Sequence, residues 1–257
     1  MSRISPRPAP WLVALAATSL AAWSVLAVDR GEFTPVVLCS AASAWASVSA
    51  SLDLALVFDS PARLAADWAL MLAAMMSPLV VAPLRHVHER SFARRRARAM
   101  LLFLAGYAAA WMSAGACLQV LALATRSMAP APLCLGLAAL AALAWQVSPA
   151  KQWCLNRCHR RPPLAAFAAP ADRDAFFFGL ANGGACAGAC WALMLLPLFA
   201  GPAHLAAMVA VTLFVCAERL EAAAPLAWRW RGPGKALRIV AAQAAMRLAP
   251  RLREAVS

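Results

Sequence analysis

The chain has 257 residues, of which 63% are hydrophobic, and 24 Lys and Arg against 11 Asp and Glu give it a formal charge of +13. This apolar share is far above the roughly 45–50% of a soluble domain, which excludes that class and indicates an integral membrane protein. No groove-reading motif accompanies the positive charge, so we expect the basic residues to face the anionic headgroups of the inner leaflet and not nucleic acid.

Alanine and leucine carry the apolar excess, and no alternation of apolar and polar residues indicates a barrel. The sequence therefore predicts an all-α fold, a polytopic transmembrane helical bundle forming one integral membrane domain over residues 1–257. A helix needs about 20 apolar residues to cross a bilayer. The six spans that we expect lie near residues 11–28, 68–84, 100–125, 130–147, 175–200 and 203–217.

The distribution of Lys and Arg predicts the orientation of these spans. With the N-terminus inside, only Arg30, Arg63 and Arg126 of the 24 basic residues fall in outer segments. Basic residues accumulate on the cytoplasmic side, so we expect both termini in the cytoplasm and the protein in a bacterial inner membrane. Residues 34–58 could form a seventh span, interrupted by Asp53, which would place the N-terminus outside; we favour an interfacial or re-entrant helix there.

The last segment, residues 226–257, alternates basic and apolar residues. Its residues Leu237, Val240, Ala244 and Leu248 recur at helical spacing. The pattern predicts a basic amphipathic helix lying on the inner leaflet. A solvated basic tail is the alternative interpretation.

The stretch GGACAGACWALM, residues 183–194, lies within the fifth predicted span. Residues four apart share one face of a helix, so Cys186, Cys190 and Met194 form a sulfur stripe. Thiolate and thioether are soft ligands that suit Cu(I). Free Cys and Met also fill apolar cores, and the nearby glycines favour close helix packing. Those glycines are Gly179, Gly183, Gly184 and Gly188.

A second pair, Cys154 and Cys158, follows the fourth predicted span at the same spacing. Basic residues surround this pair, and we expect them to lower the pKa of its thiols. They are Lys151, Arg157, Arg160 and Arg161. His159 could add a ligand, although an exposed His in a basic loop is more often solvated. In the second span Met71, Met75 and Met76 form a third soft cluster, for which core packing is the ordinary interpretation.

Glu218 lies at the inner end of the last predicted span. An ionisable group near the membrane indicates a functional site, and the alternative is an interfacial anchor that pairs with the nearby arginines. The sequence contains no phosphate-binding loop, no zinc-protease motif and no Ser-His-Asp set that points to catalysis. We therefore expect no catalytic residues and a protein that is not an enzyme.

The motifs together resemble the bacterial predicted metal-binding integral membrane proteins, a family defined as a domain of unknown function. The resemblance rests on Trp68 with Ala74-Met75-Met76-Ser77-Pro78; on Gly106-Tyr107 and Trp111; on Gln146, Lys151, Cys154-Leu155 and Cys158; and on Gly179, Gly183, Cys186, Gly188, Cys190-Trp191 and Leu193-Met194. It implies a multi-pass protein that handles metal, with a relative that supplies copper to a polyphenol oxidase. The chain departs from the family pattern at Trp145, Ala189 and Arg219, where Tyr, Cys and Lys are common.

These observations predict a membrane protein that binds Cu(I) and delivers it to a partner cuproenzyme. The expected metal ligands are Cys154, Cys158, Cys186, Cys190, Met194, Met71, Met75 and Met76, arranged as a relay in which the two cysteine pairs need not form one site unless the connecting loop folds back into the bundle. Two alternatives stay open: a membrane thiol-disulfide oxidoreductase that uses the same cysteines, and a small-solute transporter or structural subunit of a membrane complex.

Overall fold

A computed structural model describes residues 9–28, 61–165, 167–230, 232, 234–236, 238–239 and 241–243, and the regular structure of this part of the chain is entirely helical. The all-α fold is thus confirmed. The helices are α1 (Pro10–Val28), α3 (Pro61–Arg90), α4 (Arg96–Met128), α5 (Ala131–Val147), α6 (Pro149–Cys158), α7 (Ala168–Phe199), the short 3-10 helix η1 (Gly201–Ala203) and α8 (His204–Glu218).

Five of the described segments are long and apolar enough to cross a membrane: α1, α3, α4, α7 and η1 together with α8. The fourth predicted span is not among these five, because α5 is shorter than the other candidates and has only 17 residues. At 1.5 Å per residue it extends about 26 Å, less than the roughly 30 Å of a bilayer core. It becomes a sixth candidate when it is counted together with α6, to which it is joined at a bend of 70°.

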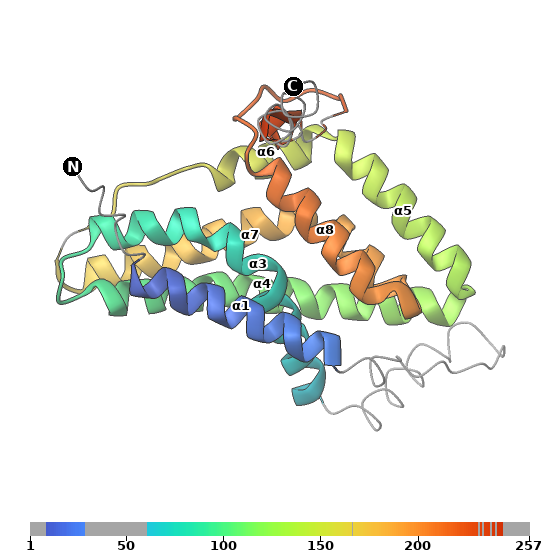
Figure 1. Cartoon of the computed structure of the whole chain (residues 1–257), viewed down its shortest axis with the longest axis horizontal. Coiled ribbons are helices and arrows are strands. Elements are labelled where there is room, and N and C mark those ends of the chain that lie inside the picture. The colour runs from blue at the N-terminus through green and yellow to red at the C-terminus, as the bar shows by residue number, and fades with distance from the viewer. Residues whose placement is uncertain are drawn as a thin grey trace, which may run out of the picture.

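Helices α4 and α7 form the centre of the bundle, with α3 packed on α4, α1 packed on α3, and both α5 and α6 packed on α7. Figure 1 shows α1, α3, α4 and α7 running side by side, while α5 and α8 diverge from them toward α6. The α3–α4 turn and the start of α7 lie at one end of these helices, and the α4–α5 and α7–α8 turns lie at the opposite end (Figure 1).

Glycines allow α4 and α7 to approach closely. A Cβ at Gly179 would collide with the backbone carbonyl of Phe103, and one at Gly183 would lie 2.8 Å from the carbonyl oxygen of Tyr107. These contacts confirm the predicted role of the two glycines in close helix packing. Gly184, in contrast, faces open space.

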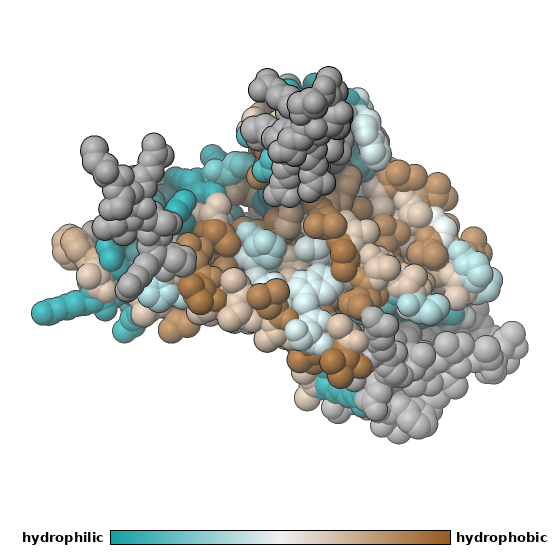
Figure 2. Space-filling model, in the orientation of Figure 1, coloured by the Kyte–Doolittle hydropathy of each residue, from teal (hydrophilic) through white to brown (hydrophobic). Residues whose placement is uncertain are grey.

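The interior is filled by large apolar side chains, and the described surface is also largely apolar. Trp111 and Phe103 are completely buried, and the indole nitrogen of Trp68 donates a hydrogen bond to the backbone carbonyl of Trp111 at 3.0 Å. Figure 2 shows hydrophobic side chains over much of the visible face between its polar ends. On α5 the exposed apolar residues are Leu133, Leu135, Leu137, Leu140 and Leu143. Such a surface suits contact with lipid chains.

Two sequence predictions fall on residues outside the described part of the chain. One is the seventh span considered at 34–58; the other is the apolar face of the tail helix, whose four marker residues are all outside it. The described tail residues 234–236, 238–239 and 241–243 are helical.

Candidate metal centre

The site begins at the break between α5 and α6. Ser148 caps α6, because its hydroxyl oxygen accepts a hydrogen bond from the backbone nitrogen of Lys151 at 3.1 Å. Pro149 occupies the first turn of α6, where its missing N–H group costs no hydrogen bond. The bend of 70° turns α6 back against α7. The loop after the fourth span therefore folds back into the bundle, which is the condition for the two cysteine pairs to meet.

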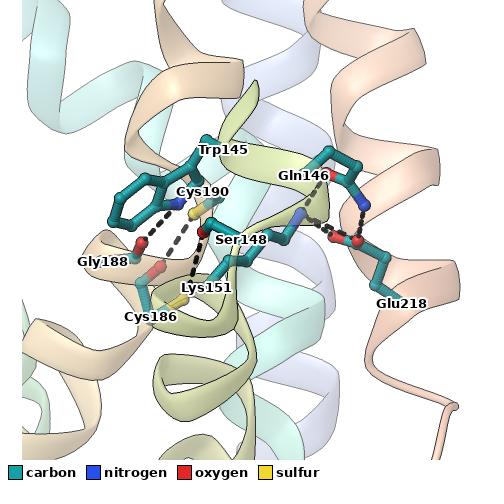
Figure 3. Close-up of polar contacts among 8 residues, drawn as sticks. All are labelled: Trp145, Gln146, Ser148, Lys151, Cys186, Gly188, Cys190 and Glu218. Atoms are coloured by element: carbon teal, nitrogen blue, oxygen red, sulfur yellow. Dashed lines mark hydrogen bonds and ion pairs between the residues drawn. The ribbon is translucent and has the colours of Figure 1, made fainter. Parts of the chain in front are cut away.

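Cys154 of α6 lies against Gly188, between the two cysteines of α7. A Cβ at Gly188 would lie only 2.7 Å from the sulfur of Cys154, so a larger residue at this position would force that sulfur to move. The backbone oxygen of Gly188 also accepts a hydrogen bond from the indole nitrogen of Trp145 at 3.0 Å (Figure 3). The end of α5 and the middle of α6 are thus both fixed to the same turn of α7.

Cys158, the second thiol of α6, lies within electrostatic reach of Cys186 on α7. The carbonyl oxygen of Cys158 accepts a hydrogen bond of 3.5 Å from the buried amide of Asn182. On α7 the thiol of Cys190 donates to the carbonyl of Cys186 at 2.9 Å, one turn back along the helix. The four cysteines therefore gather where α6 meets α7.

Tyr107 of α4 adds a polar contact that spacing alone did not predict. Its hydroxyl donates a hydrogen bond of 3.2 Å to the sulfur of Cys186, and both residues are buried. The only sequence signal for it is the Gly106-Tyr107 pair: the glycine lets α4 approach α7, and the next residue then faces the cysteine stripe. Tyr107 can orient the Cys186 sulfur without competing for a soft metal ion.

The thiols are near one another but are not arranged as a finished ligand set. All seven cysteines within the described residues are free. The same part of the chain contains no group of three or more His, Cys, Asp or Glu side chains placed to hold a metal ion. Metal binding at this site requires the thiol side chains to rotate toward a common ion.

The expected lowering of the thiol pKa at the α6 pair is wrong. Burial raises the pKa of Cys154 and raises that of Cys158 to about 12. Removal from water favours the neutral thiol, and this effect outweighs the nearby positive charges. Arg157 still lowers the pKa of Cys154, but less than burial raises it. Its guanidinium lies 4.3 Å from the ring centroid of Trp153. Both α6 thiols are therefore protonated at neutral pH.

His159 is exposed, as expected, and both of its ring nitrogens lie near backbone oxygens. Its Nδ1 lies 2.9 Å from the backbone oxygen of Leu155, and its Nε2 lies 3.3 Å from that of Arg219. The ring thus bridges the end of α6 to the residue that follows α8. Its role is structural.

The predicted methionine ligands are all buried: Met194 and Met75 are completely buried, Met71 is 3% exposed and Met76 is 2% exposed. Met194 extends the α7 stripe toward the end of that helix. The other three lie on α3, which packs chiefly against α1, α4 and α8. These three methionines belong to the same buried core cluster as Cys158, Cys186 and Cys190, and their burial is also what core packing requires.

Glu218 forms a buried ion pair, and its partner is Lys151. The ammonium nitrogen lies 2.8 Å and 2.9 Å from the two carboxylate oxygens, and the side chains are only 1% and 5% exposed. Gln146 joins both: its amide oxygen accepts from Lys151 and its amide nitrogen donates to Glu218 (Figure 3). The alternative interpretation, an anchor paired with arginines, does not describe Glu218, because its partner is Lys151. This trio fixes the α5–α6 break to the end of α8.

The segment after α8 crosses over α6 and the break. The side-chain amide of Asn156 donates to the backbone oxygen of Ala224 at 2.8 Å and accepts from its nitrogen at 3.2 Å. The backbone nitrogen of Arg229 donates to the carbonyl oxygen of Val147 at 3.2 Å. The carbonyl group left open by the end of α5 is thus satisfied by the tail.

The described part of the chain is a helical bundle with five or six candidate membrane spans, and cysteines of two of its helices lie where these helices pack together. Residues 65–242 match the PpoB2 family of copper chaperones. The match covers more than half of the chain, and the chain therefore belongs to this family, which confirms the resemblance read from the motifs. Neither a curated protein nor a solved structure matches it.

Proposed function

We propose that this protein binds Cu(I) between α6 and α7 through cysteine thiolates and delivers the ion to a partner cuproenzyme. The observation that carries the proposal is the folding of α6 back onto α7, which sets Cys154 against Gly188 and brings Cys158 within electrostatic reach of Cys186. Membership of a copper chaperone family supports copper as the metal. Thiolates are soft ligands, and soft ligands favour the cuprous ion.

The fold-back changes the predicted relay. In this proposal the two cysteine pairs form one binding site and not two successive ones. Met194 lies one turn beyond this site on α7. We propose Met194 as a weaker thioether ligand through which the ion leaves. The methionines of α3 then mainly pack the hydrophobic core. They bind the ion only after it has left the cysteine centre.

The setting that we propose is the bacterial inner membrane, with both termini in the cytoplasm and the basic tail against anionic headgroups. The segment after α8 contacts α6 directly, so the cysteine centre and the tail lie on the same side of the bundle. We propose that a partner cuproenzyme or another membrane subunit binds to a surface that is not used by the contacts described above.

The test is the copper content of the detergent-purified protein, loaded with Cu(I) under reducing conditions and measured by elemental analysis. We expect about one copper ion per wild-type chain. Cys154→Ser/Cys158→Ser and Cys186→Ser/Cys190→Ser should each lose most of it. Copper and sulfur X-ray absorption should show Cu–S coordination in the wild type that changes in both double variants.

The matched control is Cys117→Ser/Cys134→Ser, which removes two cysteines away from the α6–α7 contact. Cys117 is exposed on α4, and the thiol of Cys134 on α5 donates to the backbone oxygen of Ala129 at 3.3 Å. This variant should keep the copper content of the wild type. Negligible copper in the wild type and in all three variants would refute the proposal. Equal and substantial copper in all four proteins would show that these cysteines are not the copper ligands.

A further inference from the structure

Arg219, the residue directly after α8, brings a positive charge into the protein without a carboxylate partner. Its Nε atom is fully buried and makes no hydrogen bond. No ion pair within the described part of the chain involves it. The neighbouring Glu218 carboxylate is already neutralised by Lys151. Burying an uncompensated charge is costly, so such a charge indicates a missing anion.

The groups that surround the Arg219 guanidinium are chiefly cysteines: those of the candidate centre and Cys216 of α8. A second cation, Arg161, also lies within electrostatic reach of Cys158, but it is exposed, so water screens its charge. Cys158 of α6 and Cys186 of α7 both lie within hydrogen-bonding reach of the guanidinium, and Cys190 and Tyr107 lie within its electrostatic reach. One thiol from each cysteine pair therefore faces the same cation. A thiol is neutral and does not compensate the charge, whereas a thiolate does.

A count of charges then distinguishes between metal ions. When two thiols bind one ion, two metal–sulfur bonds form and two protons leave to solvent. A monovalent ion with two thiolates carries a charge of −1, which Arg219 brings to zero. A divalent ion with two thiolates is neutral, so the charge of Arg219 stays uncompensated. In a buried site of low dielectric constant, the difference in electrostatic energy between the two bound ions is large.

We propose that Arg219 is the counter-charge of the cysteine centre and makes it select a monovalent soft ion over a divalent one. This inference rests on the proposed copper site and adds the reason for its selectivity. Arg219 acts on the ion through the thiolates and is a positioning residue, because a guanidinium has no lone pair to offer a metal.

The test compares wild type with Arg219→Gln, Arg219→Met and Arg219→Lys in detergent. Affinities for Cu(I), Ag(I) and Zn(II) are measured by competition with chromophoric chelators at one pH. Loss of the charge should weaken Cu(I) and Ag(I) binding about 10- to 100-fold, the factor expected for a charge-assisted contact. Zn(II) binding should become stronger in the same two variants. Arg219→Lys keeps the charge and should keep the wild-type order of affinities.

Opposite changes for the two ion classes separate this role from a structural one, because a damaged fold weakens both. If Cu(I) and Zn(II) affinities change together, or if their ratio stays at the wild-type value, the inference is wrong while the copper site stands. If wild type binds no Cu(I), the proposed function itself fails. Arg219→Met retains the length of the side chain and supplies the result if the Gln variant aggregates.

Discussion

At the scale of single residues, Lys151 and Glu218 form an ion pair that is almost completely buried. Both ions have left water, and their mutual attraction together with the amide of Gln146 offsets the cost of desolvation. Removing one partner leaves the other as an uncompensated charge in the core, which costs about 3–5 kcal/mol. Removing both eliminates that penalty.

We therefore predict that Lys151→Met and Glu218→Gln each lower the free energy of unfolding by about 3–5 kcal/mol, whereas Lys151→Met/Glu218→Leu lowers it by less than either single change. Denaturant unfolding in detergent micelles provides the measurement. The matched control is Glu89→Gln, which removes the Arg85–Glu89 pair, whose side chains are both 65% exposed. An exposed pair contributes at most about 1 kcal/mol, so this control should unfold nearly as the wild type does. A double variant whose loss equals the sum of the single losses would contradict the ion-pair account.

Between elements, the contact of α6 with α7 is the one that brings the cysteine pairs together, and it depends on the absence of a side chain at Gly188. A methyl group there would meet the sulfur of Cys154 at 2.7 Å, so either that sulfur or the whole of α6 must shift. Gly184, one turn earlier on α7, has open space around it.

We predict that Gly188→Ala lowers Cu(I) affinity by about tenfold or more, since it displaces a proposed ligand from the α6–α7 contact. Gly184→Ala is the matched control and should leave the affinity unchanged. Chelator competition measures both variants, and Cys154 alkylation rates show whether the thiol has moved. Equal Cu(I) affinity in the two glycine variants would show that Cys154 is not needed at its position.

The apolar runs predicted where most of the helices lie, because helices that face lipid can be recognised from the length and composition of their sequence. They did not predict the direction of the chain after Val147. A Ser-Pro pair at 148–149 is a helix-start signal, and it could have indicated a new helix with its own axis. Spacing also identified both cysteine pairs, whereas the Lys151–Glu218 pair joins residues 67 positions apart and only the tertiary fold brings them together.

For the whole molecule, the arrangement of the helix ends bears on orientation. The α3–α4 turn and the start of α7 lie at one end of the central helices, and the α4–α5 and α7–α8 turns lie at the other (Figure 1). The α3–α4 turn is rich in arginine, with Arg94, Arg95 and Arg96 in succession. Cytoplasmic loops accumulate such residues, which favours this end as the cytoplasmic one.

We predict that reporters fused after Arg98 and Arg161 lie in the cytoplasm, and that reporters fused after Ala129 and Gly201 lie outside it. Paired alkaline phosphatase and fluorescent protein fusions measure the two locations. Activity of the phosphatase after Arg98 would reverse the proposed orientation, and with it the side of the membrane on which the basic tail lies.

The segment after α8 has a consequence for the order of events during synthesis. Its backbone supplies partners to Asn156 of α6 and to Val147 at the α5–α6 break, and Glu218 just before it completes the buried trio. Glu218 and the segment after α8 emerge from the ribosome only after α7 with its cysteines. We therefore expect α6 to be held in its final position only when the last part of the chain has been made. A nascent chain would then carry all four cysteines without yet presenting them to a metal ion together.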